Sequence, residues 1–155
     1  MIITFVGHGS LYGCESLEKQ LQRVVIKSIR REEYTCFYCG GYGDFDALCA
    51  KTCRFVKKQY KNCETVLITP YITDLQQEKI KHLLEAGLYD SCLYPPLERV
   101  PPRYAIRRRN EWMVDEADLI IAYVQHTHGG AYKTLEYARR KKKCIVNLAE
   151  EWEEK

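Results

Sequence analysis

The predicted fold follows from one short stretch, residues 35–46, which reads TCFYCGGYGDFD. Its first half, Thr35–Cys39, is an apolar run that is typical of a buried β-strand. Glycines then end the strand, and from Phe45 onward apolar residues repeat at helical spacing. A strand, a glycine-rich turn and a helix in this order predict one unit of a parallel α/β sheet.

The same alternation continues on both sides of this stretch. Further strands are expected at 2–6, 65–69, 119–124 and 144–148. Helical periodicity is present at 17–29, 74–86, 104–117 and 131–142. The proline-rich segment before the helix at 104–117 is expected to be a loop over a ligand crevice. We therefore expect a single domain, residues 1–155, with an α/β, Rossmann-like fold: a mostly parallel sheet with helices on both faces.

Composition places the chain among ordinary globular proteins. Hydrophobic residues make up 46% and charged residues 29% of the chain, a balance that allows one buried core. A formal net charge of +3 is too small to indicate nucleic acid as a partner. No apolar run reaches the roughly 20 residues that span a bilayer, and the N-terminal segment is expected to form a strand rather than a signal peptide. We therefore expect no membrane association and a cytoplasmic location.

The eight cysteines raise the question of zinc. Cys36, Cys39, Cys49 and Cys53 follow a C-x2-C…C-x3-C pattern, which resembles zinc-ligand spacing. However, Cys36 and Cys39 lie on the expected strand, about 10 Å apart and on opposite faces, whereas two thiolates on one Zn²⁺ each lie about 2.3 Å from the metal. We therefore expect reduced structural thiols, no metal and no cofactor.

Open parallel sheets bind their ligands beyond the carboxyl ends of the strands. That rule gathers the loops after the expected strands at 2–6, 35–39 and 119–124, together with the arginine-rich start of the helix at 104–117. The candidate ligand-binding residues are Gly7, His8, Ser10, Gly40, Gly41, Gly43, Asp46, Arg103, Arg109, Asn110, His128, Gly129, Gly130 and Thr134.

Two glycine-rich turns indicate the kind of ligand. Residues 40–43 and 129–130 each open a helix, where backbone amides and the helix dipole attract an anion. A tight turn without ligand is the alternative for either one alone. Arg109 shares a helix stripe with Ile106 and Met113 and is therefore expected to face the sheet, where its planar fork suits phosphate. The sequence predicts a phosphate-bearing, nucleotide-type ligand.

Other polar side chains are expected at the mouth of the same crevice. Asp46, near the first turn of the second helix, would cap backbone amides or accept a hydrogen bond from a ribose hydroxyl. His8, His126 and His128 lie on loops, and because no carboxylate stands at a supporting spacing, we expect hydrogen bonds to the ligand rather than a metal triad. No arrangement of Ser, His and Asp predicts a hydrolase triad.

These motifs together resemble the SLOG superfamily, the Rossmann-like group that joins the DNA-processing protein DprA with the Lonely Guy cytokinin-activating enzymes. The likeness is strongest to a small, stand-alone bacterial and phage branch, and it covers nearly the whole chain. It rests on residues 5–8, 40–46, 103–104 and 109–113, with Asp118, Gly129, Gly130 and Ala138. The resemblance implies a parallel sheet, homodimers or higher homo-oligomers, and binding of nucleotide-derived signals, in some members as sensors in antiphage defence.

The resemblance also raises the question of catalysis. Lonely Guy enzymes cleave the N-glycosidic bond of nucleoside monophosphates with an arginine and a glutamate, and the arginine's motif resembles the segment that contains Arg109. The glutamate's motif, P-G-G-x-G-T-x-x-E, departs here, because one residue is added before Thr134 and Tyr137 stands three places after it. Glu136 is adjacent, but a shift of one residue on a helix turns a side chain by about 100°.

Three functions therefore follow from the sequence. The first is a sensor or sequestering module for a nucleotide-derived small molecule. The alternative is a phosphoribohydrolase-like enzyme with Arg109 and Glu136 as its catalytic residues. DNA binding in the manner of DprA is a third hypothesis, which the absence of a long basic stripe disfavours.

Overall fold

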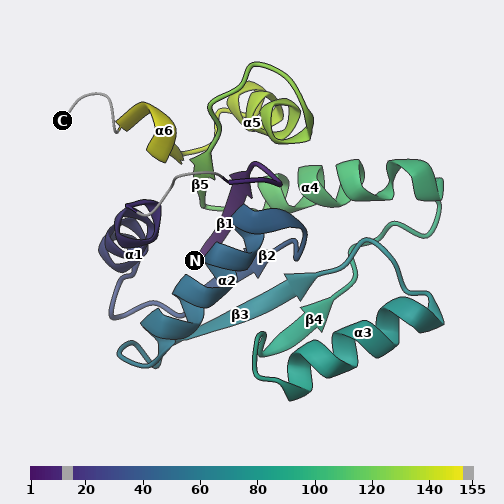
Figure 1. Ribbon diagram of the computed structural model, residues 1–155, viewed down its shortest axis with the longest axis horizontal. Coiled ribbons are helices and arrows are strands. Elements are labelled where there is room, and N and C mark those ends of the chain that lie inside the picture. Colours follow the sequence, from purple (N-terminus) through teal and green to yellow (C-terminus); the bar gives the residue numbers. More distant parts are fainter. Residues whose placement is uncertain (12–15, 152–155) are drawn as a thin grey trace.

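The computed structural model describes residues 1–11 and 16–151 of the chain. Within these ranges a six-stranded sheet forms, and every strand pair in it is parallel. The strands are β1 (Ile2–Gly7), β2 (Thr35–Cys39), β3 (Cys63–Ile68), β4 (Ser91–Leu93), β5 (Leu119–Tyr123) and β6 (Ile145–Asn147). Their order across the sheet is β4-β3-β2-β1-β5-β6 (Figure 1), which confirms the expected α/β, Rossmann-like fold.

Helices cover both faces of the sheet. They are α1 (Leu17–Ser28), α2 (Gly43–Lys57), α3 (Asp74–Glu85), α4 (Ala105–Glu116), α5 (Gly130–Arg140) and α6 (Leu148–Glu151), with a 3-10 turn at Pro102–Tyr104. Neighbouring residues of β1 show the two sides. Ile3 and Phe5 pack into a core with α1 and α2, whereas Val6 packs into a second core with α4 and α5. Burial on both faces explains why β1 is apolar without alternation.

β1 lies in the middle of the sheet, and later strands add on both sides of it. β2, β3 and β4 extend the sheet on one side, and β5 and β6 extend it on the other. The loops after β1 and β5 therefore diverge at a topological switch point, the place where open α/β sheets bind their ligands. This is the edge at which the sequence predicts the site.

The segment between α3 and α4 is more regular than the sequence indicates. Ser91–Leu93 forms the edge strand β4, which pairs with residues 66–68 of β3. Its three residues are half-buried, so the strand shows neither the alternation nor the long apolar run that marks strands in a sequence. The following helix begins at Ala105 rather than at 104, because the 3-10 turn precedes it.

The cysteines of the zinc-like pattern are divided between two environments. Cys39 is buried with Cys49 and Cys53 in the core between α2 and the sheet, whereas Cys36 donates a hydrogen bond to Glu64 on β3. Burial raises the pKa of the Cys49 and Cys53 thiols well above the ordinary value. In the part of the chain that the structure describes, no group of three or more His, Cys, Asp and Glu side chains is arranged to hold a metal ion.

The described helices are all too short or too polar to cross a membrane.

Candidate functional site

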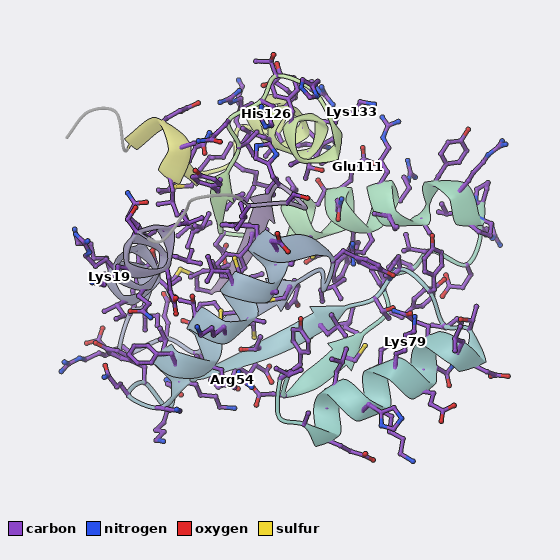
Figure 2. All side chains as sticks on the ribbon, viewed as in Figure 1. Lys19, Arg54, Lys79, Glu111, His126 and Lys133 are labelled. Atoms are coloured by element: carbon purple, nitrogen blue, oxygen red, sulfur yellow. The ribbon has the colours of Figure 1, made fainter. Side chains whose placement is uncertain are left out.

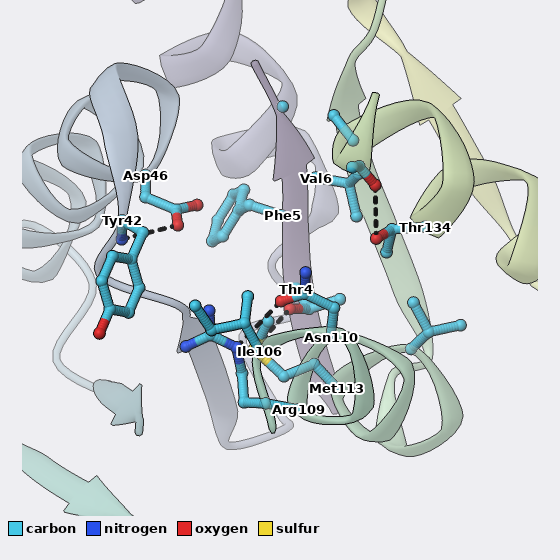
Figure 3. A pocket seen from close by; sticks show the side chains of 14 residues that line it. Thr4, Phe5, Val6, Tyr42, Asp46, Ile106, Arg109, Asn110, Met113 and Thr134 are labelled. Atoms are coloured by element: carbon cyan, nitrogen blue, oxygen red, sulfur yellow. Dashed lines mark hydrogen bonds between the residues drawn. The ribbon is translucent and has the colours of Figure 1, made fainter. Parts of the chain in front are cut away.

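A small cavity of about 150 Å³ lies against β1, where α2, α4 and α5 converge. Residues 4–7 of β1 form one wall, and Tyr42 and Asp46 line it from the start of α2. The lining residues from the other two helices are Ile106, Arg109, Asn110, Met113 and Val114 of α4, and Gly130, Ala131 and Thr134 of α5. Figure 3 shows the α2 side chains on one side of the cavity and Thr134 on the other. The fold therefore brings distant segments to one small space.

Arg109 is the largest of the fully buried side chains, with 2% of its surface exposed. Its Nη1 donates hydrogen bonds to the backbone oxygens of Gly40 and Ile68, both at 2.7 Å, and its Nε donates to Asn110 Oδ1 at 2.9 Å. The guanidinium group thus joins α4 to the carboxyl ends of β2 and β3. Among the described residues, no carboxylate oxygen lies within 4.0 Å of it. Burial lowers the pKa of Arg109, and the negative charge of Asp46 in the same cavity acts in the opposite direction.

Asp46 lines the same cavity from α2. Its Oδ2 accepts a hydrogen bond from the Tyr42 amide at 3.0 Å. Burial raises the pKa of Asp46 to about 6, although the Tyr42 amide and the Arg109 charge act in the opposite direction. The Tyr42 ring also covers Arg109, with its centroid 5.4 Å from the guanidinium carbon. Near neutral pH this carboxyl group therefore changes between a hydrogen-bond acceptor and a donor.

The N-terminus of α5 opens onto the cavity without a side-chain cap. Gly129 precedes the helix with a φ of 90°, in the left-handed region that favours glycine. A methyl group on Gly129 or Gly130 would meet no atom of the described chain within 4 Å. Space is therefore open beside the start of α5, and helix N-termini of this kind bind anions in other proteins.

The glycine-rich turn before α2 is built differently. The Tyr42 amide is bound by Asp46, and the Asp44 amide donates to the Gly9 backbone oxygen at 2.8 Å. Gly43 has a φ of 87°, and a methyl group on it would lie 2.7 Å from Gly9 Cα. The amides of Tyr42 and Asp44 therefore already have acceptors within the protein.

The three loop histidines lie together at the switch point: the rings of His126 and His128 are stacked, and the ring of His8 is tilted by 45° against that of His126. The ring centroids of His8 and His126 are 4.7 Å apart, and those of His126 and His128 are 5.3 Å apart. His8 Nε2 accepts a hydrogen bond from the Gln125 amide at 2.9 Å, which joins the loops after β1 and β5. Burial and the two neighbouring imidazoles lower the pKa of His8. The three histidines do not line the small cavity.

A second cavity, of about 590 Å³, lies between α4 and α5 and adjoins the first. The residues that line both are Ile106, Asn110, Gly130 and Thr134. Glu136 lines only this outer cavity, where its Oε1 accepts a hydrogen bond from Arg139 Nη1 at 2.6 Å. The structure thus places Glu136 outside the small cavity that holds Arg109.

The structure divides the predicted site residues into three groups. Those that line the small cavity are Gly7, Asp46, Arg109, Asn110, Gly130 and Thr134. Arg103 lines the outer cavity alone. Those that line neither are His8, Ser10, Gly40, Gly41, Gly43, His128 and Gly129. Thr4 and Tyr42 also line the small cavity, although they are not among the residues predicted from the sequence. For Tyr42, its position within the glycine-rich turn could have indicated this.

Comparison with solved structures places this architecture among known folds. DNA processing protein A (DprA) from Helicobacter pylori superposes with a TM-score of 0.62 and 13% identity, over 94% of this chain and 63% of that one. DprA from Streptococcus pneumoniae superposes with a TM-score of 0.60 and 12% identity, over 92% of this chain and 48% of that one. A structural-genomics target named TM1055 gives a TM-score of 0.55 and 12% identity, over 93% and 71%.

The chain has a DprA-like, Rossmann-like fold. The resemblance in the sequence motifs is thereby confirmed for the fold. No family model matches the sequence, and no curated protein does. The chain spans about half the length of the Streptococcus protein, so the likeness shows a shared architecture and not a shared activity. The Helicobacter protein is described by its mode of binding single-stranded DNA.

Proposed function

We propose that this SLOG-type domain binds a phosphate-bearing, nucleotide-type ligand in the small cavity. The observation that supports this most is Arg109, a buried guanidinium group whose hydrogen-bond partners are all neutral. The uncapped N-terminus of α5 lies on another wall of the same cavity. A phosphate group between them would receive charge-assisted hydrogen bonds from the arginine and from backbone amides.

Asp46 favours a ligand in which hydroxyl groups accompany the phosphate. Its carboxyl group lines the cavity beside Arg109, and it would repel a second negative charge but accept a hydrogen bond from a ribose hydroxyl. The cavity of about 150 Å³ is smaller than the roughly 300–1,000 Å³ of most small-molecule sites. We infer that the sugar phosphate occupies it and that the remainder of the nucleotide extends into the outer cavity.

The same arrangement favours a sensor or sequestering module over a hydrolase. N-glycosidic cleavage passes through an oxocarbenium-like transition state, which a carboxylate must face. Glu136, the carboxylate nearest in sequence to the glutamate of the Lonely Guy motif, is bound by Arg139 and lines only the outer cavity. A hydrolase that uses Arg109 is the alternative. Homo-oligomers and a place in antiphage defence remain predictions from the family resemblance.

Thermal unfolding with a panel of nucleotides tests the binding. A ligand at about 100 times its Kd should stabilise the protein by roughly 2.7 kcal/mol, seen as a raised Tm. Gly130→Val is the matched variant, because Gly130 lines the cavity and a Cβ at this position would meet no other atom within 4 Å. This variant should keep the unliganded Tm and lose the shift. No shift with any nucleotide would reject the proposal.

Chromatography of AMP after long incubation with the protein tests the alternative. A binding module leaves AMP intact. A hydrolase releases adenine and ribose 5-phosphate, and Glu136→Gln or Asp46→Asn should then stop turnover while binding persists. Free adenine from the wild type alone would establish the hydrolase and reject the sensor.

A specific observation also favours single-stranded DNA as a second candidate ligand, against the expectation from net charge. Tyr104 is 45% exposed, and the Arg103 guanidinium carbon lies 4.8 Å from its ring centroid. Exposed aromatic rings beside cations form stacking platforms for unpaired bases. Fluorescence anisotropy with an oligothymidylate should show binding that weakens with salt and is lost in Tyr104→Ala. Absence of binding at low salt would reject this candidate.

A further inference from the structure

We propose that the outer cavity between α4 and α5 is a second phosphate subsite, so that the ligand carries two phosphate groups. This inference rests on the proposed function, because it takes the first phosphate to lie beside Arg109. The small cavity and the outer cavity share four lining residues and therefore lie directly beside each other. A single ligand can occupy both.

The charges around the outer cavity do not balance. Its charged lining residues are Arg103, Arg107, Lys133, Arg140, Glu111 and Glu136. Both carboxylates already have cationic partners: Glu136 is bound by Arg139, and Glu111 lies within 4.0 Å of Arg107 and Arg108.

The remaining cations face the cavity without an acidic partner. Among the described residues, no carboxylate oxygen lies within 4.0 Å of Arg103, Lys133 or Arg140. Arg140 lies over the Tyr137 ring, with its guanidinium carbon 5.8 Å from the centroid. The walls of the outer cavity therefore carry net positive charge, which complements an anion.

The position of Lys133 distinguishes this cavity from an ordinary helix face with solvated charges. Arg140 lies in the last turn of α5, where a cation is stabilised by the helix dipole. Lys133 instead follows the first turn of α5, whose N-terminal end is positive, and that turn contains no acidic residue. The helix dipole therefore gives no stabilisation to a cation at this position, in contrast to Arg140. Figure 2 shows Lys133 on α5 and Glu111 on α4, the two helices that form the cavity.

A nucleoside monophosphate would place no anion beside the positive charges of the outer cavity. With its phosphate beside Arg109, only its uncharged base would reach the outer cavity. A ligand with a second phosphate, either a nucleoside bisphosphate or a small dinucleotide, would place that phosphate between Lys133 and Arg140. The class of ligand is therefore a nucleotide with two phosphate groups.

Calorimetry with AMP, ADP, adenosine 3′,5′-bisphosphate and the dinucleotide pApA tests the proposal. At least one of the two-phosphate ligands should bind wild type ten or more times tighter than AMP, which is about 1.4 kcal/mol. The double variant Lys133→Ala/Arg140→Ala should abolish this gain and leave AMP affinity within about twofold, because neither side chain lines the small cavity. Which of the three ligands shows the gain then distinguishes the nucleoside bisphosphate from the dinucleotide.

The matched control is Lys79→Ala/Lys81→Ala, which removes the same charge from exposed positions on α3 (Figure 2 labels Lys79). It should keep the gain. Equal wild-type affinities for AMP and all two-phosphate ligands would overturn the second subsite and leave the proposed function standing, as would a gain that survives in the Lys133/Arg140 variant. Binding of no nucleotide at all would instead reject the proposed function itself.

Discussion

The two glycine-rich helix starts of this protein have similar sequences and opposite environments. Before α2, the amides of Tyr42 and Asp44 are bound within the chain, and Gly43 lies against Gly9. Before α5, no side chain caps the helix, and the space in front of Gly130 is open. Glycine serves the packing of two loops in the first turn and leaves access to the helix end in the second.

This difference separates two reasons for glycine that a sequence motif does not distinguish. A positive φ and a close backbone neighbour require glycine for stability alone. In the second turn Gly129 likewise needs its positive φ, whereas Gly130 leaves room for a ligand to approach the open helix N-terminus. Substitution in the turn before α2 should therefore lower stability, whereas substitution of Gly130 before α5 should weaken nucleotide binding.

The largest effect is expected from Gly43→Ala. The left-handed φ and the contact with Gly9 Cα should together cost about 2–4 kcal/mol of unfolding free energy. Gly130→Ala should change the unfolding free energy by less than about 1 kcal/mol and weaken nucleotide binding instead. Urea unfolding and calorimetry of both variants measure the two properties. Equal losses of stability at the two positions would remove the distinction between the turns.

The next effect concerns Arg109, which serves both stability and the proposed anion site. Arg109→Ala should lose about 2–4 kcal/mol, because two backbone carbonyls lose their donor and a buried volume is emptied. Arg109→Met refills most of that volume without the charge, so it should recover part of the stability and none of the nucleotide binding. Wild-type affinity in Arg109→Met would show that the guanidinium group does not contact the ligand.

Asp46→Asn should have a smaller effect that depends on pH. The pKa of Asp46 in the folded protein, about 6, lies above its ordinary value of 3.8, so wild type loses stability as pH rises through 6. The amide keeps an oxygen acceptor for Tyr42 and removes the charge. The variant should therefore be more stable than wild type by on the order of 1–3 kcal/mol at pH 8, with little difference at pH 4. A constant difference across this range would contradict the assignment.

The smallest effect on stability is expected from substitution of His8, which lies beside His126 at the switch point. Because the pKa of His8 is lowered, wild type should lose stability as pH falls below the ordinary value of 6.5, where protonation opposes the hydrogen bond from Gln125. His8→Asn should make the fall in Tm between pH 7.5 and 5.5 shallower. His82→Asn, on the exposed side of α3, is the control and should follow wild type. An identical slope in all three proteins would exclude His8 as the titrating group.

The sequence by itself determined the parts of this protein that depend on local pattern. Apolar runs marked β1 and β2, and helical spacing placed Arg109 on the stripe that faces the sheet, where the structure buries it. The bounds of β2 are those expected, because its glycines end the strand within the chain itself. Periodicity records which face of an element is buried, so it reveals the fold class and the buried residues of long elements.

Only the tertiary structure decided three features. These are which of the two glycine turns is open, which cavity Glu136 lines, and that the three loop histidines lie together. Each depends on a partner far away in the sequence: Gly9 contacts Gly43, Gln125 donates to His8, and α4 forms the second wall of the outer cavity. The edge strand β4 could not be predicted from the sequence either, because its three half-buried residues form a strand only by pairing with β3. Whether an amide is free or a charge is balanced depends on contacts between distant elements, and the local sequence pattern does not show those contacts.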